Sequence, residues 1–115
     1  QTTNSFSREE IIQLQNRVEE VHVDEKIVDY ILSLVHSTRL DRRTIHGVSV
    51  RGSQELHRLC KARAVCQNRD YVIPEDVKVL APYALSHRIL SHQFEERLAQ
   101  ENYISELLDS IPIPL

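Results

Sequence analysis

Apolar side chains recur at intervals of three and four residues along most of this chain, and nowhere do they alternate over a useful length. The clearest run is Ile11, Leu14 and Val18, which follows the capping box Ser7-Arg8-Glu9-Glu10. Because the strands of a half-buried sheet need a period of two, this spacing predicts helices and no sheet. The predicted fold is all-α, a small bundle of four or five helices.

Start and stop residues place the predicted helices along the chain. The helices are expected over residues 8–20, 25–38, about 50–68, from 74 as far as Pro82, 83–89 and 103–111. Asp24 is the expected N-cap of the second helix, and Pro74 begins the fourth. Pro82 is expected to break or kink that fourth helix, because its ring removes a helical hydrogen bond. Residues 90–100 show no clear period.

The chain of 115 residues has the size of one domain. Within a single unit over 1–115 we expect an N-terminal helix and link at 1–23, core helices at 24–89 and a C-terminal extension at 90–115. No stretch approaches the ~18 consecutive apolar residues of a membrane-spanning helix. The chain lacks methionine, and we expect it to be a piece of a longer protein.

Chemistry-bearing residues form no recognisable catalytic or metal template. Cys60 and Cys66 lie in one predicted helix, where six residues rotate by ~120° and rise ~9 Å, so they cannot pair with each other. Both are expected to be small buried thiols in a reducing cytoplasm. The histidines form no H-x-x-x-H pair, so no metal site is expected. Glu75-Asp76 follows a proline at a helix start and is assigned to capping rather than catalysis.

The only two glycines of the chain lie in Gly47-Val48-Ser49-Val50-Arg51-Gly52, where a loop leads into a helix. A phosphate-binding loop of the G-x-x-x-x-G-K-[ST] kind therefore cannot be built from this chain. Ser49 is a candidate N-cap, and Arg51 falls in the first turn, where backbone N–H groups and the helix dipole favour an anion. The planar guanidinium of Arg51 suits phosphate. Taken alone, the stretch is also consistent with a solvated arginine.

Four segments occur in a fixed order along the chain. They are Tyr30–Arg39, G-V-S-V-R-G, N-R-D-Y-V-I-P-E-D-V at 68–77 and L-S-H-R-I at 85–89. Together they resemble the C-terminal lid domain of MoxR-type AAA+ ATPases, which shows Y-x-x-x-L-V-x-x-T-R, G-A-S-P-R-A, G-R-D-Y-V-x-P-E-D-V and L-x-H-R-I in this order. The resemblance covers residues 8–115 and implies the helical fold of such a lid.

By this resemblance, Arg51 takes the position of the sensor-two arginine, which reaches from the lid to the γ-phosphate of ATP held by a preceding core domain. Ser49 and Val50 are implied to lie beside the nucleotide. Val50 stands where the family usually has proline, and Gly52 where it usually has alanine, which loosens the mounting of the arginine. The resemblance implies that a parent chain hydrolyses ATP with Mg²⁺, whereas this fragment alone is not expected to be an enzyme.

The resemblance also implies a cytoplasmic, chaperone-like ring. Its lid would contact its own core domain, neighbouring subunits and, in many members, von Willebrand factor A domain proteins. The alternative is a free-standing helical interaction module, because residues 39–69 carry eight basic and two acidic side chains in a chain of net charge −3. An acidic protein fits that module better than a nucleic acid, since no aromatic residue between 31 and 70 offers a stacking platform.

Overall fold

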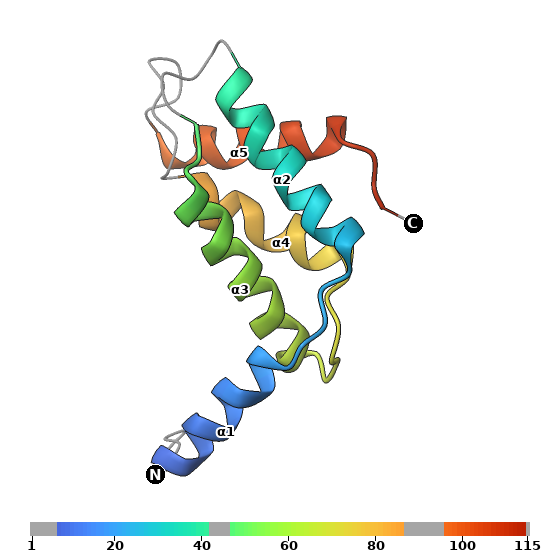
Figure 1. Ribbon diagram of the computed structural model, residues 1–115. Helices are drawn as coiled ribbons and strands as arrows, with labels where there is room; N and C mark the ends of the chain where they lie inside the picture. The colour runs from blue at the N-terminus through green and yellow to red at the C-terminus, as the bar shows by residue number, and fades with distance from the viewer. Residues whose placement is uncertain (1–6, 42–46, 87–95, 115) are drawn as a thin grey trace.

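Five α-helices make up the part of the chain that the computed structural model describes, residues 7–41, 47–86 and 96–114. Their bounds are α1 Arg8–Glu19, α2 Glu25–Leu40, α3 Val50–Cys66, α4 Pro74–Leu85 and α5 Arg97–Ser110. Helices α2 to α5 form a bundle, and α1 projects from one end of α3 (Figure 1). No strand occurs in the described ranges. The predicted all-α bundle is therefore confirmed.

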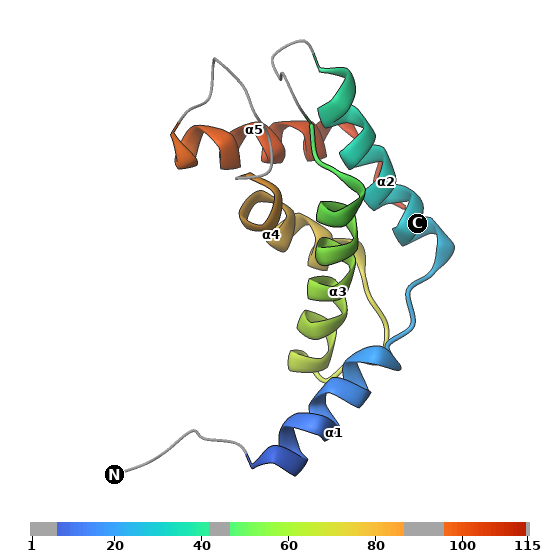
Figure 2. The ribbon, with the colours of Figure 1, turned by 60° about the vertical axis from the view of Figure 1, so that its left-hand side comes forward.

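The core lies between α2, α3, α4 and α5. Each of these helices contributes an aliphatic side chain with no exposed surface: Leu34, Leu56, Val77 and Ile104. Full burial of such a side chain stabilises the fold by roughly 1.5–3 kcal/mol. Helix α1 contributes no buried residue and leaves the bundle at an angle (Figure 2). The stable body of the domain is therefore the four-helix part.

The starts of α1 and α2 follow the sequence predictions. Glu10 N–H donates to Ser7 Oγ at 3.1 Å, and Ser7 N–H donates to Glu10 Oε1 at 2.9 Å, which completes the predicted capping box. Asp24 caps α2 by accepting a hydrogen bond from Lys26 N–H at 2.9 Å. Helix α2 continues two residues beyond the predicted range of 25–38. Local hydrogen-bond chemistry therefore predicted both starts correctly.

Helix α3 ends at Cys66, two residues before the predicted end, because the chain turns at Asn68. Asn68 has a φ of 59°, in the left-handed region that asparagine tolerates better than most residues. Its N–H donates to Val65 C=O at 2.9 Å, and Arg69 N–H donates to Ala64 C=O at 2.8 Å. This is the Schellman pattern, which satisfies the last carbonyls of a helix.

Of the predicted break or kink at Pro82, the break is wrong. Helix α4 runs through Pro82 to Leu85, so residues 83–85 belong to it, and residues 87–89 of the predicted separate helix lie outside the described residues. Pro82 cannot donate a hydrogen bond to Lys78 C=O, which costs a helix interior roughly 3 kcal/mol. The Pro82 ring is buried, as are Val77 and Ala81 on the same helix. We attribute the continuous helix to this packing, which offsets the lost hydrogen bond.

Helix α5 begins at Arg97, six residues before the predicted start of 103. Its first turn shows no apolar period, and Leu98 is 67% exposed. This turn forms instead from good helix formers and from an ion pair between Arg97 Nε and Glu101 Oε2 at 3.0 Å. Periodicity therefore missed the part of the helix that does not face the core.

A short parallel bridge joins the link after α1 to the loop before α4. His22 N–H donates to Asp70 C=O at 2.8 Å, and Val72 N–H donates to His22 C=O at 3.0 Å. The two segments run side by side beside α3 (Figure 1). The bridge fixes the direction in which the chain leaves α1.

The two cysteines differ in their surroundings, which corrects the prediction that both are buried. Cys60 is buried, whereas Cys66 is exposed at the end of α3. The rotation between two helical positions six residues apart prevents both from facing the same core. Burial, followed by the negative charge of Asp76, raises the pKa of the Cys60 thiol to about 12.

Native alkylation should therefore modify one cysteine per chain. Cys66 is accessible to iodoacetamide, while Cys60 is sterically covered and scarcely populates the reactive thiolate at pH 8. Mass spectrometry of the intact protein should show one added group in buffer and two in denaturant. Two groups on the folded chain would contradict this assignment of Cys60 to the core.

Candidate functional site

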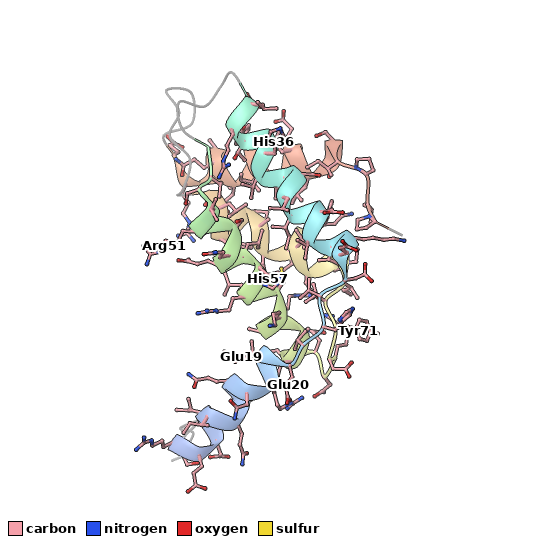
Figure 3. All side chains as sticks on the ribbon, viewed as in Figure 1. Glu19, Glu20, His36, Arg51, His57 and Tyr71 are labelled. Atoms are coloured by element: carbon pink, nitrogen blue, oxygen red, sulfur yellow. The ribbon has the colours of Figure 1, made fainter. Side chains whose placement is uncertain are left out.

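The predicted phosphate-contacting residues lie at the start of α3. Ser49 is its N-cap, as predicted, and its Oγ accepts a hydrogen bond from Gly52 N–H at 3.3 Å. Val50 is the first helical residue, and Arg51 follows with an exposed side chain. Figure 3 shows Arg51 pointing away from the bundle, and no described residue provides it with a hydrogen bond or an ion pair. The guanidinium is therefore available to an external ligand.

The segment before α3 is attached to the end of α2. Thr38 Oγ1 accepts a hydrogen bond from Val48 N–H at 2.9 Å, and Arg39 Nε donates to Val48 C=O at 2.9 Å. Gly47 lies against the α2 backbone, where a Cβ would be 2.6 Å from Arg39 N and 2.7 Å from Thr38 C. A side chain at Gly47 would collide with that backbone, so glycine is required there. Motif residues from two predicted segments thus meet at one point.

Basic residues of the 39–69 stretch gather in the sequence between the last turn of α2 and the first turn of α3, and we call Arg39, Arg42, Arg43, His46 and Arg51 the basic cluster. Arg39 binds Val48 through its Nε, and Arg51 extends outward. The other members, Arg42, Arg43 and His46, lie outside the described residues. Of the two described members of the cluster, Arg39 therefore donates a hydrogen bond within the fold and Arg51 points into solvent.

A groove of about 1320 Å³ runs between α1, α2 and α3. Apolar side chains from all three helices line it, among them Ile11, Leu32, Val50 and Leu59. Helical spacing places Leu59 near the same face as Leu56 and Cys60, but Leu59 is 43% exposed, and Leu32 is 51% exposed. Exposed aliphatic side chains and polar side chains together therefore line this groove.

One end of this groove adjoins the start of α3, because Val50 lines the groove and Arg51 is the next residue. His57 lies further along α3 and also lines the groove (Figure 3). Burial, followed by the charge of Lys61, lowers the pKa of His57, so the ring is largely neutral at pH 7. The candidate site thus combines Arg51 in the first turn of α3 with a neighbouring groove lined by both apolar and polar side chains.

A model of the AAA lid domain family matches residues 36–107. The chain belongs to the AAA lid domain family. The Bacillus subtilis relative "Uncharacterized protein YeaC" is 36% identical over 112 residues, which cover 96% of this lid and 35% of that protein. "Chaperone MoxR1" of Mycobacterium tuberculosis is 26% identical over 125 residues, which cover 99% of this lid and 33% of that protein. The lid is of the MoxR type.

A solved structure agrees with this assignment. The crystal structure of a "putative ATPase" from Cytophaga hutchinsonii has a TM-score of 0.80 and 30% sequence identity to this lid. The match covers 93% of this chain and 36% of the Cytophaga chain. The lid therefore spans about a third of the length of the proteins it matches.

The lid is braced by a buried ion network that the sequence analysis missed. The Asp76 side chain is fully buried, and its two oxygens accept hydrogen bonds from Arg69 Nη2 at 2.7 Å and Nη1 at 3.0 Å. Arg63 of α3 also donates to Asp76. The Ile73 N–H donates to Asp76 Oδ2 at 2.9 Å, which confirms the predicted capping role of this aspartate. The network ties α3, the loop after it and α4 together.

The position of Arg63 within an apolar face was the available signal for this network. An arginine in such a face is expected to lay its stem on the core and extend its guanidinium into water, whereas the Arg63 guanidinium pairs with the buried Asp76. Burial would raise the pKa of the Asp76 carboxyl, but the hydrogen bonds from Arg69, Ile73 and Arg63 outweigh burial and lower it. Asp76 therefore remains a carboxylate at neutral pH.

Residues 7–41, 47–86 and 96–114 contain neither a metal cluster nor a membrane-spanning helix. No group of three or more histidine, cysteine, aspartate or glutamate residues there could hold a metal ion. No described helix is long and apolar enough to cross a membrane.

Proposed function

We propose that this lid couples the nucleotide state of a MoxR-like parent ATPase to movement of the lid, with Arg51 as the sensor-two contact to the γ-phosphate. The observation that carries the proposal is the exposed Arg51 in the first turn of a capped helix, which pairs with none of the residues that the structure describes. The helix N-terminus and the guanidinium both favour an anion, and Ser49 and Val50 lie beside it in the chain. The chemistry of such a site is positioning and charge stabilisation.

The switching mechanism follows from differential affinity. A charge-assisted contact that exists with ATP and is lost with ADP favours one lid position over another, which is the requirement for a population shift. ATP and Mg²⁺ would be held by the core domain of the parent, since the lid sequence has no phosphate-binding loop. The apolar groove between α1, α2 and α3 is the surface that we assign to that core domain.

The wider setting is proposed from the family. The parent would assemble as a cytoplasmic ring and act as a chaperone, a role supported by the name of the relative "Chaperone MoxR1". Its partners would be neighbouring subunits and von Willebrand factor A domain proteins. Within the lid we assign residues 1–23 to an N-terminal helix and link, 24–89 to the core and 90–115 to a C-terminal extension.

The experiment that tests the proposal is steady-state ATP hydrolysis and ADP affinity of the parent enzyme carrying Arg51→Ala. A loss of hydrolysis with unchanged ADP affinity supports the assignment, because ADP has no γ-phosphate for Arg51 to contact. Unchanged hydrolysis rejects it and leaves Arg51 as a solvated arginine at a helix start.

The 115-residue lid alone should not hydrolyse ATP and should bind it more weakly than about 1 mM. One arginine at a helix end contributes about 1–3 kcal/mol, whereas a millimolar site requires about 4 kcal/mol. Isothermal titration calorimetry with ATP and Mg²⁺ measures this directly. Micromolar binding by the lid alone would contradict the assignment of the nucleotide to the core domain.

A further inference from the structure

The peptide units on both sides of Val48 are held by α2. The unit before Val48 donates its N–H to Thr38 Oγ1, and the unit after it accepts from Arg39 Nε, both at 2.9 Å. Thr38 Oγ1 donates in turn to Val35 C=O at 2.6 Å, which fixes the direction of the hydroxyl. We call this set of contacts from Thr38 and Arg39 to Val48 the α2 clamp.

The two residues that form the Thr38–Val48 hydrogen bond of the α2 clamp are buried. Thr38 and Val48 both have 0% exposed surface, so water cannot replace the hydroxyl if it is removed. The Val48 N–H would then be buried without a partner, which is costly. The close approach of Gly47 to the α2 backbone adds a steric restraint at the preceding residue. The chain therefore has little freedom at Gly47 and Val48, just before α3 begins.

These restraints act close to Arg51. Only Ser49 and Val50 separate the clamp from Arg51, and Ser49 is held as the N-cap of α3. Val50 stands at the first helical position, where a proline would have fixed φ, so the chain itself does not restrict that start. The restraint comes instead from α2, through contacts between residues about ten positions apart.

We infer that Thr38 and Arg39 are positioning residues for Arg51, an inference that rests on the proposed γ-phosphate contact. They fix the position at which α3 begins. They thereby fix the position of the Arg51 backbone, from which the guanidinium extends toward the phosphate. Transition-state contacts tolerate little displacement, since a shift of about 1 Å can cost about 100-fold in rate. Neither residue touches the nucleotide in this scheme; each acts through the backbone of Val48.

The test uses the full-length parent enzyme with Thr38→Val, which keeps the shape of the side chain and removes the hydroxyl. We expect kcat for ATP hydrolysis to fall about 10-fold with little change in KM. Thr38→Ser, which keeps the hydroxyl, should stay within about 2-fold of the wild type. Loss of activity in Thr38→Ser equal to that in Thr38→Val would overturn the role of the hydroxyl.

A double-mutant cycle separates positioning from general destabilisation. If Thr38 acts through Arg51, Thr38→Val should lower kcat no further in an Arg51→Ala background. The same 10-fold loss in both backgrounds would overturn the inference while leaving the proposed function intact. An Arg51→Ala enzyme with wild-type kcat would instead reject the proposed function and the inference together.

Two further variants guard against a failure to fold. Arg39→Met removes the Nε donor from an exposed side chain, so the fold should persist, and kcat should fall about 3-fold only when Arg51 is present. Val77→Ala weakens the core on α4 outside the clamp and should leave kcat at the wild-type level well below the melting temperature.

Hydrogen exchange of peptides over 47–52 should accelerate in Thr38→Val and not in Val77→Ala. Equal protection in both variants would overturn the clamp.

Discussion

Replacing Arg51 with alanine in the full-length parent should lower kcat for ATP hydrolysis by about 100-fold or more. The expected size follows from the loss of a charged donor that meets the phosphoryl oxygens as their charge redistributes in the transition state. Because Arg51 is exposed and makes no hydrogen bond or ion pair within the described residues, its removal should not disturb the lid itself. ADP affinity should change little. Steady-state hydrolysis and ADP titration measure the two effects separately.

Two variants control this prediction. Arg51→Lys should also lose most of the activity, because an ammonium on a different stem cannot reproduce the planar fork of two donors. Arg97→Ala is the matched control, since it removes the same charge from the first turn of another helix, α5. Its side chain is 79% exposed and, within the described part of the chain, pairs with Glu101 at the surface, so hydrolysis should be nearly unchanged. Equal losses in the Arg51 and Arg97 variants would point to a general charge effect.

The second large effect is expected at Asp76, in stability rather than catalysis. Asp76→Asn keeps the size of the side chain but removes the charge that Arg63 and Arg69 share. Breaking a buried ion pair costs about 3–5 kcal/mol. We expect about 3 kcal/mol, because the Arg63 and Arg69 side chains remain 24% and 16% exposed and can regain some hydration. Urea unfolding of the lid should report this loss, together with a fall in Tm of about 10 °C.

The same carboxylate makes stability depend on acidity. The pKa of Asp76 is lower in the folded lid than in the unfolded chain, so its contribution is complete above the unfolded value of about 3.9. As the pH falls below that value and through the lower folded pKa, this contribution is lost. Glu75→Gln is the matched control, because Glu75 precedes Asp76 in the same first turn but is exposed. Glu75→Gln should lower the free energy of unfolding by less than about 1 kcal/mol and leave the dependence of stability on pH unchanged. If the wild type, Asp76→Asn and Glu75→Gln all show the same dependence on pH, Asp76 is not its source.

Helix caps, whose partners lie within about four residues of each other, could be predicted from the sequence. The capping box at Ser7, the cap at Asp24 and the cap at Ser49 each join groups two or three residues apart, and all three are present. The position of Arg51 in a first turn follows from the cap before it. The family was recognisable because its motifs keep their order and spacing, whatever their contacts in space.

Features that depend on which surface meets which neighbour were not readable. Helical spacing places Leu59 and Cys60 next to each other, but the positions of α1, α2 and α4 decide that Cys60 is buried and Leu59 faces a groove. In the same way, Pro82 continues a helix in a buried setting, although it breaks helices in isolation. Periodicity gives the relative angle of side chains and not the direction of the core.

The polar contacts of the lid also fall into local contacts, which the sequence predicts, and long-range contacts, which it does not. A cap needs only its own turn of helix, so residue type and spacing are enough to predict it. The pairing of Arg63 with Asp76 and the hold of Thr38 on Val48 join residues ten or more positions apart. Such contacts form only after the helices have packed, because packing brings the groups together and excludes the water that would otherwise satisfy them. Short stretches of sequence thus determine the helices, their caps and the motifs of the family. The contacts that hold the backbone before Arg51 form only in the assembled fold.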